Sequence, residues 1–352
     1  MENKSQKVFL EYLHSFRGLA IILIVLLHST YSTIFLTNQL GSHKYFEIIT
    51  QVLLHGSTIF FAVISGILFS NILRNRGFKR FYISKTKYVI LPYLLFTIVL
   101  TLVMVKFKVF ANDGYLEALL QYIKLVFENF IYGEAHYIYW YIPVLMFLYL
   151  VTPFLDYIQK ANTLSKVLFV IFMVLPLFFS RMGMSFQTMV YFMGCYCFGM
   201  YLGDNLEMKL NYFKKHIHVI TIIAIVSTIS LFYLYWNDMD LVGNISLKES
   251  FFYIQKTSFT LIIILFFKQL HEQPKWLDGI ARDSFAIYFL HGPILFILNF
   301  IFSKLIHELY FNPIYIILLA LLLFFLAISI SMLIVYVFRR IFGKKSRMLI
   351  GS

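Results

Sequence analysis

The sequence predicts an all-α protein: a polytopic membrane helix bundle of about ten transmembrane helices with both termini cytoplasmic. Of its 352 residues, 60% are hydrophobic and only 13% are charged, and the mean hydropathy is +0.79. This composition is far from that of a soluble globular domain. Apolar runs long enough to cross a bilayer also recur along the whole chain, and basic residues gather in alternate connections between them.

Ten segments fit the template of about 20 mostly apolar residues that a spanning helix needs. They are 13–35, 48–72, 87–105, 136–157, 164–180, 186–203, 216–236, 252–270, 283–304 and 313–338. Residues 116–131 are apolar at helical spacing but include three charged residues, so we expect an amphipathic helix on the membrane surface. No linker or soluble appendage is visible, which predicts one membrane domain over 1–352 with a short basic cytoplasmic tail at 339–352.

The distribution of charge tests this topology independently of hydropathy. With the N-terminus inside, 21 of the 30 Lys and Arg residues fall on the inner side, 8 fall outside, and Arg17 lies within the first helix. The connection 237–251 is outside and comparatively acidic. This asymmetry matches the positive-inside rule. Because the first apolar run follows a short basic lead and has no small-residue cleavage site, we expect an uncleaved first helix and a multi-pass protein of the cytoplasmic membrane.

Composition also excludes several classes of function. A net charge of +13 would suggest nucleic-acid binding in a soluble chain, but here topology accounts for the basic residues, and no nucleic-acid motif is visible. Cys195 and Cys197 lie in one apolar segment and point in different directions around a helix, which argues against a disulfide framework or a zinc site. We expect no metal.

The first apolar segment carries an arginine and a histidine at membrane depth. Arg17 and His28 are eleven residues apart, close to three helical turns, so they share one face about 16 Å apart along the helix. Ionisable groups at this depth usually face a bundle interior or a water-filled cleft and mark a site. The alternative interpretation is that Arg17 snorkels to the interface and His28 packs as an ordinary core histidine.

Two further motifs follow in the second and third segments. In FFAVISG, Ser65 and Gly66 interrupt a bulky run; close helix packing is one role for them, and a serine nucleophile is the other. In SKTKYVILPY, Lys85 and Lys87 lie at the cytoplasmic mouth, before Pro92 and Tyr93. Topology and anionic lipid headgroups would account for the lysines, whereas with Arg17 they would form a basic vestibule for a phosphate-bearing ligand.

Aromatic residues and histidines recur near two later segments. His136 and Trp140 are four residues apart at the outer end of the fourth segment, and therefore share a helical face; they belong either to an interfacial aromatic belt or to an acceptor platform that suits a carbohydrate. Tyr288 and His291 are three residues apart on one face of the ninth segment. With His28, His291 is a second histidine within the membrane. That both are ordinary packing residues is therefore a weaker explanation than a functional role.

Taken together, these residues resemble the acyltransferase 3 family of integral membrane enzymes, which O-acylate cell-surface glycans and related acceptors. The resemblance runs from near residue 10 to the tail and rests on the order of its parts: Arg17 and His28 with ten residues between them, FFAVISG, the basic pair before Pro92 and Tyr93, the Trp140–Pro143 segment, and IYFLH ending at His291. The layout also looks like the branch associated with poly-N-acetylglucosamine adhesin loci. Many members carry arginines where this chain has Lys85 and Lys87, and some append an extracytoplasmic domain that is not seen here.

The resemblance implies acyl-CoA as co-substrate, either acetyl-CoA or succinyl-CoA, and a hydroxyl acceptor on a glycan or lipid-linked molecule. Arg17, Lys85, Lys87 and Tyr93 would hold the donor, with Arg17 also in the catalytic centre. His28 would take the proton of the attacking hydroxyl. The residues assigned to the substrate are Ser65, His136, Trp140, Tyr288 and His291. Membrane lipids and envelope-biosynthesis proteins are the expected partners.

An exporter of a polysaccharide or lipid-linked glycan that transfers no acyl group is the alternative function. Aromatic segments and a polar cavity would serve it too. Inverted repeats would support it, and no convincing correspondence between the two halves of the sequence is visible.

Overall fold

The computed structural model describes residues 2–37, 44–104, 115–181, 183–242, 245–305 and 313–352. Nearly all of these residues are helical, with one short antiparallel ribbon in which Leu241 pairs with Ser246 and Val242 with Ile245. The elements, with η marking 3-10 or π turns, are α1 (Glu2–Thr37), α2 (Lys44–Leu54), α3 (Thr58–Leu68), η1 (Phe69–Leu73), η2 (Arg74–Arg76), α4 (Phe78–Lys85), η3 (Thr86–Ile90), α5 (Leu91–Met104), α6 (Tyr115–Tyr132), α7 (Tyr141–Lys160), α8 (Thr163–Val174), η5 (Leu175–Leu177), α9 (Phe186–Gly203), α10 (Leu206–Lys215), α11 (Ile217–Trp236), β1 (Leu241–Val242), β2 (Ile245–Ser246), α12 (Leu247–Gln269), α13 (Lys275–Arg282), α14 (Ser284–Leu305), α15 (Pro313–Phe342), η6 (Gly343–Lys345) and α16 (Ser346–Ile350).

The all-α membrane bundle predicted from the sequence is confirmed. Within the described chain, eight helical stretches are long and apolar enough to cross a membrane, against about ten predicted. The other two predicted segments, 164–180 and 186–203, also form helices. The first is a shorter apolar helix, Thr163–Leu177. The second, α9, is buried along most of its length, because its small and aromatic residues pack inside the bundle.

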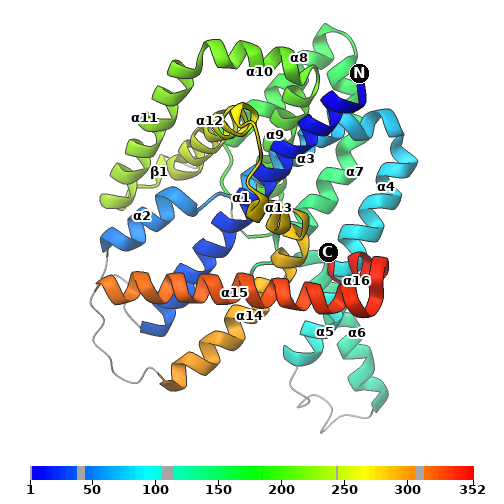
Figure 1. Cartoon of the computed structure of the whole chain (residues 1–352), viewed down its shortest axis with the longest axis vertical. Coiled ribbons are helices and arrows are strands. Elements are labelled where there is room, and N and C mark those ends of the chain that lie inside the picture. The colour runs from blue at the N-terminus through cyan, green and yellow to red at the C-terminus, as the bar shows by residue number, and fades with distance from the viewer. Residues whose placement is uncertain (1, 38–43, 105–114, 182, 243–244, 306–312) are drawn as a thin grey trace.

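Helix α1 lies at the centre of the molecule. It contacts α2, α3, α12, α13, α14 and α15, and Figure 1 shows it running obliquely through the bundle, with α15 crossing it. Its core side chains include Phe16, Ala20 and Val25, which are fully buried. A helix with neighbours on several sides can carry polar side chains at membrane depth, because those sides offer protein partners instead of lipid.

Two predicted spans differ from the helices observed. The segment 48–72 was predicted as one helix, but it is interrupted at His55–Ser57, where Gly56 adopts φ +76° between α2 and α3. Only glycine takes this backbone conformation at little cost, so the break follows from the residue itself. The segment 136–157 begins as turns and becomes helical only at Tyr141. The prediction that His136 and Trp140 share a helical face is therefore wrong.

The structure also bears on three other segments predicted from the sequence. The basic tail predicted at 339–352 is not an appendage: α15 continues to Phe342, and α16 packs beside α5 and η3. The amphipathic segment 116–131 is helical, as α6, and contacts α5. Its position on a membrane surface stays a prediction. The predicted span 87–105 corresponds to η3 and α5, and its last residue lies outside the described chain.

Helices α3 and α9 approach each other closely because both have glycine at the contact. A Cβ added at Gly66 would lie 2.2 Å from the carbonyl oxygen of Tyr196, and one added at Gly199 would lie 2.1 Å from the carbonyl oxygen of Val63. Real side chains never come so near, so the two backbones touch through glycine alone. The sequence left two roles open for Ser65 and Gly66, close helix packing and a serine nucleophile. The structure confirms close packing for Gly66.

We expect Gly199→Ala to destabilise the protein, because the methyl group must push α3 and α9 apart. Overpacking of this kind costs about 1–3 kcal/mol, and the thermal midpoint of the detergent-solubilised protein should fall by several degrees. Gly279→Ala is the matched control, since a Cβ there meets only Met332 Cε at 3.6 Å. Equal midpoints for the two variants would contradict the packing argument.

Candidate active site

Three imidazoles from separate parts of the chain meet in the bundle. His28 lies on α1, His136 lies in the turns before α7, and His291 lies on α14. The ring centroids of His28 and His291 are 5.4 Å apart. His136 packs against Gly292, where an added Cβ would fall 2.6 Å from its Cε1 atom. The sequence predicted each of these residues singly, and the structure brings them together.

Each imidazole keeps a buried nitrogen without a hydrogen-bond partner among the described residues. These atoms are His28 Nδ1, His136 Nε2 and His291 Nε2. His291 Nδ1 lies 2.9 Å from the carbonyl oxygen of Ile287, so Nδ1 carries the proton and Nε2 is left as an acceptor. Burial, and to a smaller extent His291, lowers the pKa of His136 to about 4. Unsatisfied buried nitrogens are costly unless a ligand completes them, which marks the cluster as a site.

His28 lies in the wall between two cavities. The larger, about 640 Å³, is lined by His28, Tyr31, Ser32, Tyr137 and Asn299 among others. Here Asn299 Nδ2 donates to Ser32 Oγ at 3.2 Å, while Asn299 Oδ1 is buried without a partner in the described chain. Ser32, Asn299 and Ser303 place polar groups in a lining that is otherwise mostly aromatic, and such a mixture suits a ligand that carries hydroxyl groups.

The smaller cavity, about 140 Å³, is also lined by His28 and, like the larger one, by Tyr31. Predicted residues Trp140 and Tyr288 line it together with Leu27, His55 and Arg181. The Tyr288 hydroxyl donates to the carbonyl oxygen of Ile138, which fixes its ring beside His291, with centroids 5.9 Å apart. The two cavities together give the His28 imidazole access to two different ligands.

A cationic cluster lies toward the end of α1 that the topology places in the cytoplasm. Arg17, Lys85 and Arg347 are close enough to interact electrostatically. Arg17 Nε donates to the carbonyl oxygen of Ala281 at 3.0 Å, Lys85 Nζ lies 4.6 Å from the Tyr149 ring centroid, and Arg347 stacks on Tyr88 at 4.4 Å. None of these three cations forms an ion pair with a carboxylate within the described residues, which makes the cluster a candidate anion site.

Three residues that the sequence analysis assigned to the site lie in neither the imidazole cluster nor the cationic cluster. Lys87 is exposed and lies two residues from Lys85, on another side of the helical turn. The Tyr93 hydroxyl donates to the carbonyl oxygens of Asn129 and Phe130 at 3.1 and 2.9 Å, and thereby ties α5 to α6. Ser65 lies beside the Tyr149 hydroxyl, near Lys85 and apart from the imidazoles. No hydrogen bond from Ser65 to a basic side chain is found among the described residues, so its role as a nucleophile stays a prediction.

Sequence reasoning missed His55 and Arg181 at the smaller cavity, Arg347 of the cationic cluster, and two residues beside Arg181, which are Glu249 and Lys256. Lys256 lies within the predicted span 252–270. It could have been identified by the argument used for Arg17, that an ionisable residue at membrane depth usually marks a site. Glu249 precedes Lys256 by seven residues, which is close to two helical turns and therefore the same face. No signal in the sequence links Arg181 to them, because it comes from a connection far along the chain.

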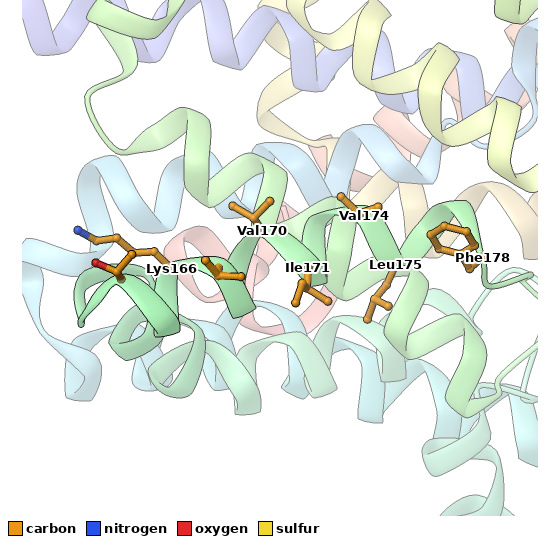
Figure 2. A pocket seen from close by; sticks show the side chains of 8 residues that line it. Lys166, Val170, Ile171, Val174, Leu175 and Phe178 are labelled. Carbon is orange, nitrogen blue, oxygen red and sulfur yellow. The ribbon is translucent and has the colours of Figure 1, made fainter.

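A third hollow, an apolar groove of about 430 Å³ on α8, is not a candidate for the chemistry. Figure 2 shows Val170, Ile171, Val174, Leu175 and Phe178 along it, with Lys166 at one end. No group that can act as an acid, a base or a nucleophile converges on it. Apolar side chains of this kind are what a helix presents to lipid.

The arrangement is suited to transfer of a group between an anionic ligand and a hydroxyl. A buried neutral imidazole acts as a general base, and a cluster of unpaired cations holds phosphate or carboxylate groups. His28 and Arg17 lie on one face of α1, about 16 Å apart by the rise of 1.5 Å per residue, and Lys85 and Arg347 come to Arg17 from α4 and α16. No group of three or more metal-ligating residues occurs in the described chain.

Comparison with known proteins agrees with this chemistry. The family model for the acyltransferase domain of acyltransferase 3 proteins matches residues 10–340, which include every residue of the site named above except Arg347. Comparisons with curated proteins and with solved structures found no match. With long apolar helices throughout, the chain belongs to the acyltransferase 3 family, and it is a membrane acyltransferase.

Proposed function

We propose that the protein is an O-acyltransferase that moves an acetyl or succinyl group from cytosolic acyl-CoA to a hydroxyl of a cell-surface glycan or related envelope acceptor. The observation that carries the proposal is the sharing of His28 by two cavities, on the same helix as Arg17 of the cationic cluster. A donor and an acceptor can thereby reach one base from different sides. The likeness to the poly-N-acetylglucosamine branch is part of this proposal, as is a location in the cytoplasmic membrane.

The donor would enter from the cytosol with its phosphates on Arg17, Lys85 and Arg347. Arg347 takes the place that the sequence analysis gave to Lys87, because it interacts with the other two cations and Lys87 does not. An arginine fork binds a phosphate with two hydrogen bonds, and a lysine binds it as a point charge. The pantetheine arm then extends toward His28.

The acceptor would occupy the 640 Å³ cavity between α1 and α14. Ser32, Asn299 and Tyr31 offer hydroxyl and amide groups there, and the aromatic rings of Tyr137 and Phe296 cover apolar C–H surface. His28 takes the proton of the hydroxyl as it attacks the thioester carbon. His136 and His291 lie next to the reacting groups, and Trp140 and Tyr288 shape the cavity on the donor side.

We expect His28→Ala to lose transfer by about 10²–10⁴-fold, the usual contribution of a general base. The measurement is mass spectrometry of envelope glycans from cells that express the wild type, the variant or an empty vector, before and after mild alkali that cleaves esters. The matched control is His218→Ala, an exposed histidine on α11. Full transfer by folded His28→Ala protein would contradict the mechanism.

The same measurement separates the proposed function from export. An alkali-labile mass increment present only with the wild type identifies transfer, and its size names the acyl group. An unmodified glycan whose amount outside the cell changes on expression would favour an exporter instead.

We expect Lys85→Glu to weaken binding of acyl-CoA by about 10–100-fold, because charged hydrogen bonds contribute about 1.5–3 kcal/mol each. The binding should also weaken with salt. Lys87→Glu is the control for position. The Lys87 side chain is exposed, and a charge screened by solvent contributes little, so this variant should change the affinity for acyl-CoA by less than about threefold. Isothermal calorimetry of the detergent-solubilised protein measures both. Equal losses for the two variants would show that Lys85 has no special place in the site.

A further inference from the structure

A second group of charged residues lies opposite His28, at the break between α2 and α3. Arg181 Nε donates to Glu249 Oε2, and His55 Nε2 lies 3.7 Å from Glu249 Oε1. Lys256 Nζ donates to the carbonyl oxygen of Leu53 at 2.8 Å. The Arg181 side chain is only 7% exposed and that of Glu249 13%. Four ionisable residues from three parts of the chain therefore meet inside the bundle, since Glu249 and Lys256 both lie on α12.

One donor of this group is unused. The Arg181 guanidinium pairs with Glu249 and lies over the rings of Tyr191 and Phe192, 5.1 and 5.9 Å from their centroids. Arg181 Nη2, however, is buried and has no hydrogen-bond partner among the described residues. A buried donor without an acceptor costs free energy. An oxygen atom in the neighbouring cavity would supply that acceptor.

That cavity measures about 140 Å³ and is lined by both His28 and Arg181. A water molecule takes up about 30 Å³ of the liquid, so the cavity holds about five atoms of that size. Such a volume fits a short acyl group with its sulfur. The side chains of Ile24, Leu27 and Ile138 give it an apolar part, and Gly56 leaves space beside Arg181, because a Cβ there would lie 3.5 Å from Nη2.

We propose that the 140 Å³ cavity is the acyl pocket and that the Arg181 guanidinium, through Nη2, stabilises the oxyanion that forms on the acyl carbonyl. This inference rests on the proposed function. The acceptor oxygen bonds to the carbonyl carbon while His28 takes its proton, and the carbonyl electron pair moves to the oxygen facing Arg181. When that pair returns, the carbon–sulfur bond breaks, and the CoA thiolate receives the proton from His28. Glu249 and His55 position the guanidinium.

The first test compares Arg181→Lys with the wild type in permeabilised cells given radiolabelled acetyl-CoA, with alkali-labile label in the envelope glycan as the readout. Loss of an oxyanion donor lowers kcat by about 10²–10³-fold, and KM for acetyl-CoA should change by less than about threefold, because the contact forms mainly in the transition state. Arg74→Lys is the matched control: Arg74 is also buried and paired with carboxylates, Asp156 and Asp204, but lines neither cavity. Rates are expressed per folded protein.

If Arg181→Lys fails to fold, the pair Arg181→Gln and Glu249→Gln removes both charges together and should fold while still losing kcat. Repeating the assay with succinyl-CoA identifies the source of the anionic oxygen. A loss confined to succinyl-CoA and seen in KM would assign Arg181 to a permanent carboxylate and overturn the oxyanion role. Unchanged kcat with both donors would overturn it as well.

The second test addresses the size of the pocket. The wild type should use acetyl-CoA at least about tenfold better than hexanoyl-CoA, since one excess methylene already costs about 1–3 kcal/mol in a tight pocket. Leu27→Ala should narrow that ratio. Equal use of both donors by the wild type overturns the acyl pocket but leaves the proposed function intact. Absence of label with every donor contradicts the proposed function itself.

Discussion

The cost of placing ionisable side chains at membrane depth is the constraint on which the rest of the structure depends. Arg17 and His28 cannot face lipid, because a charged or hydrogen-bonding group there finds no partner. Their helix is therefore enclosed by six others, and the elements around it supply the remaining polar groups. The central position of α1, the two cavities beside His28 and the cationic cluster at its other end all follow from this requirement.

Interruptions of the helices supply the site with groups that straight helices would not deliver. The turn at His55–Ser57 places His55 at the small cavity, and the turns before Tyr141 place His136 against Gly292. Non-helical backbone at membrane depth is tolerated where it is buried in protein or lines a cavity. Both turns contain a glycine with positive φ, Gly56 and Gly133, so the sequence contains the local cause of each interruption.

The sequence predicted the class of fold and most of the imidazole cluster because these depend on local signals: apolar length, charge asymmetry and an ionisable residue within an apolar run. It did not predict which polar residues meet, because that depends on packing between distant segments. Lys85 and Lys87 look equivalent in the sequence, yet the helical turn separates them, and Arg347 folds back from α16 to take the second position. Trp140 reaches the cavity from a turn, although the helical face assigned to it does not exist. The roles of all these residues in donor and acceptor binding stay predictions.

Two arginines inside the bundle show how the use of their donors distinguishes a structural cation from a functional one. Arg74 lies 2.6 Å from Asp156 and 3.0 Å from Asp204, and it also donates to Gln159. These partners come from other helices, so Arg74 joins helices. Arg181 pairs with Glu249 through Nε but keeps Nη2 buried without a hydrogen-bond partner among the described residues. A buried donor without an acceptor costs free energy. The free donor therefore favours a ligand on Arg181, and the place of Arg181 and His28 in the lining of one cavity favours the reacting acyl group as that ligand.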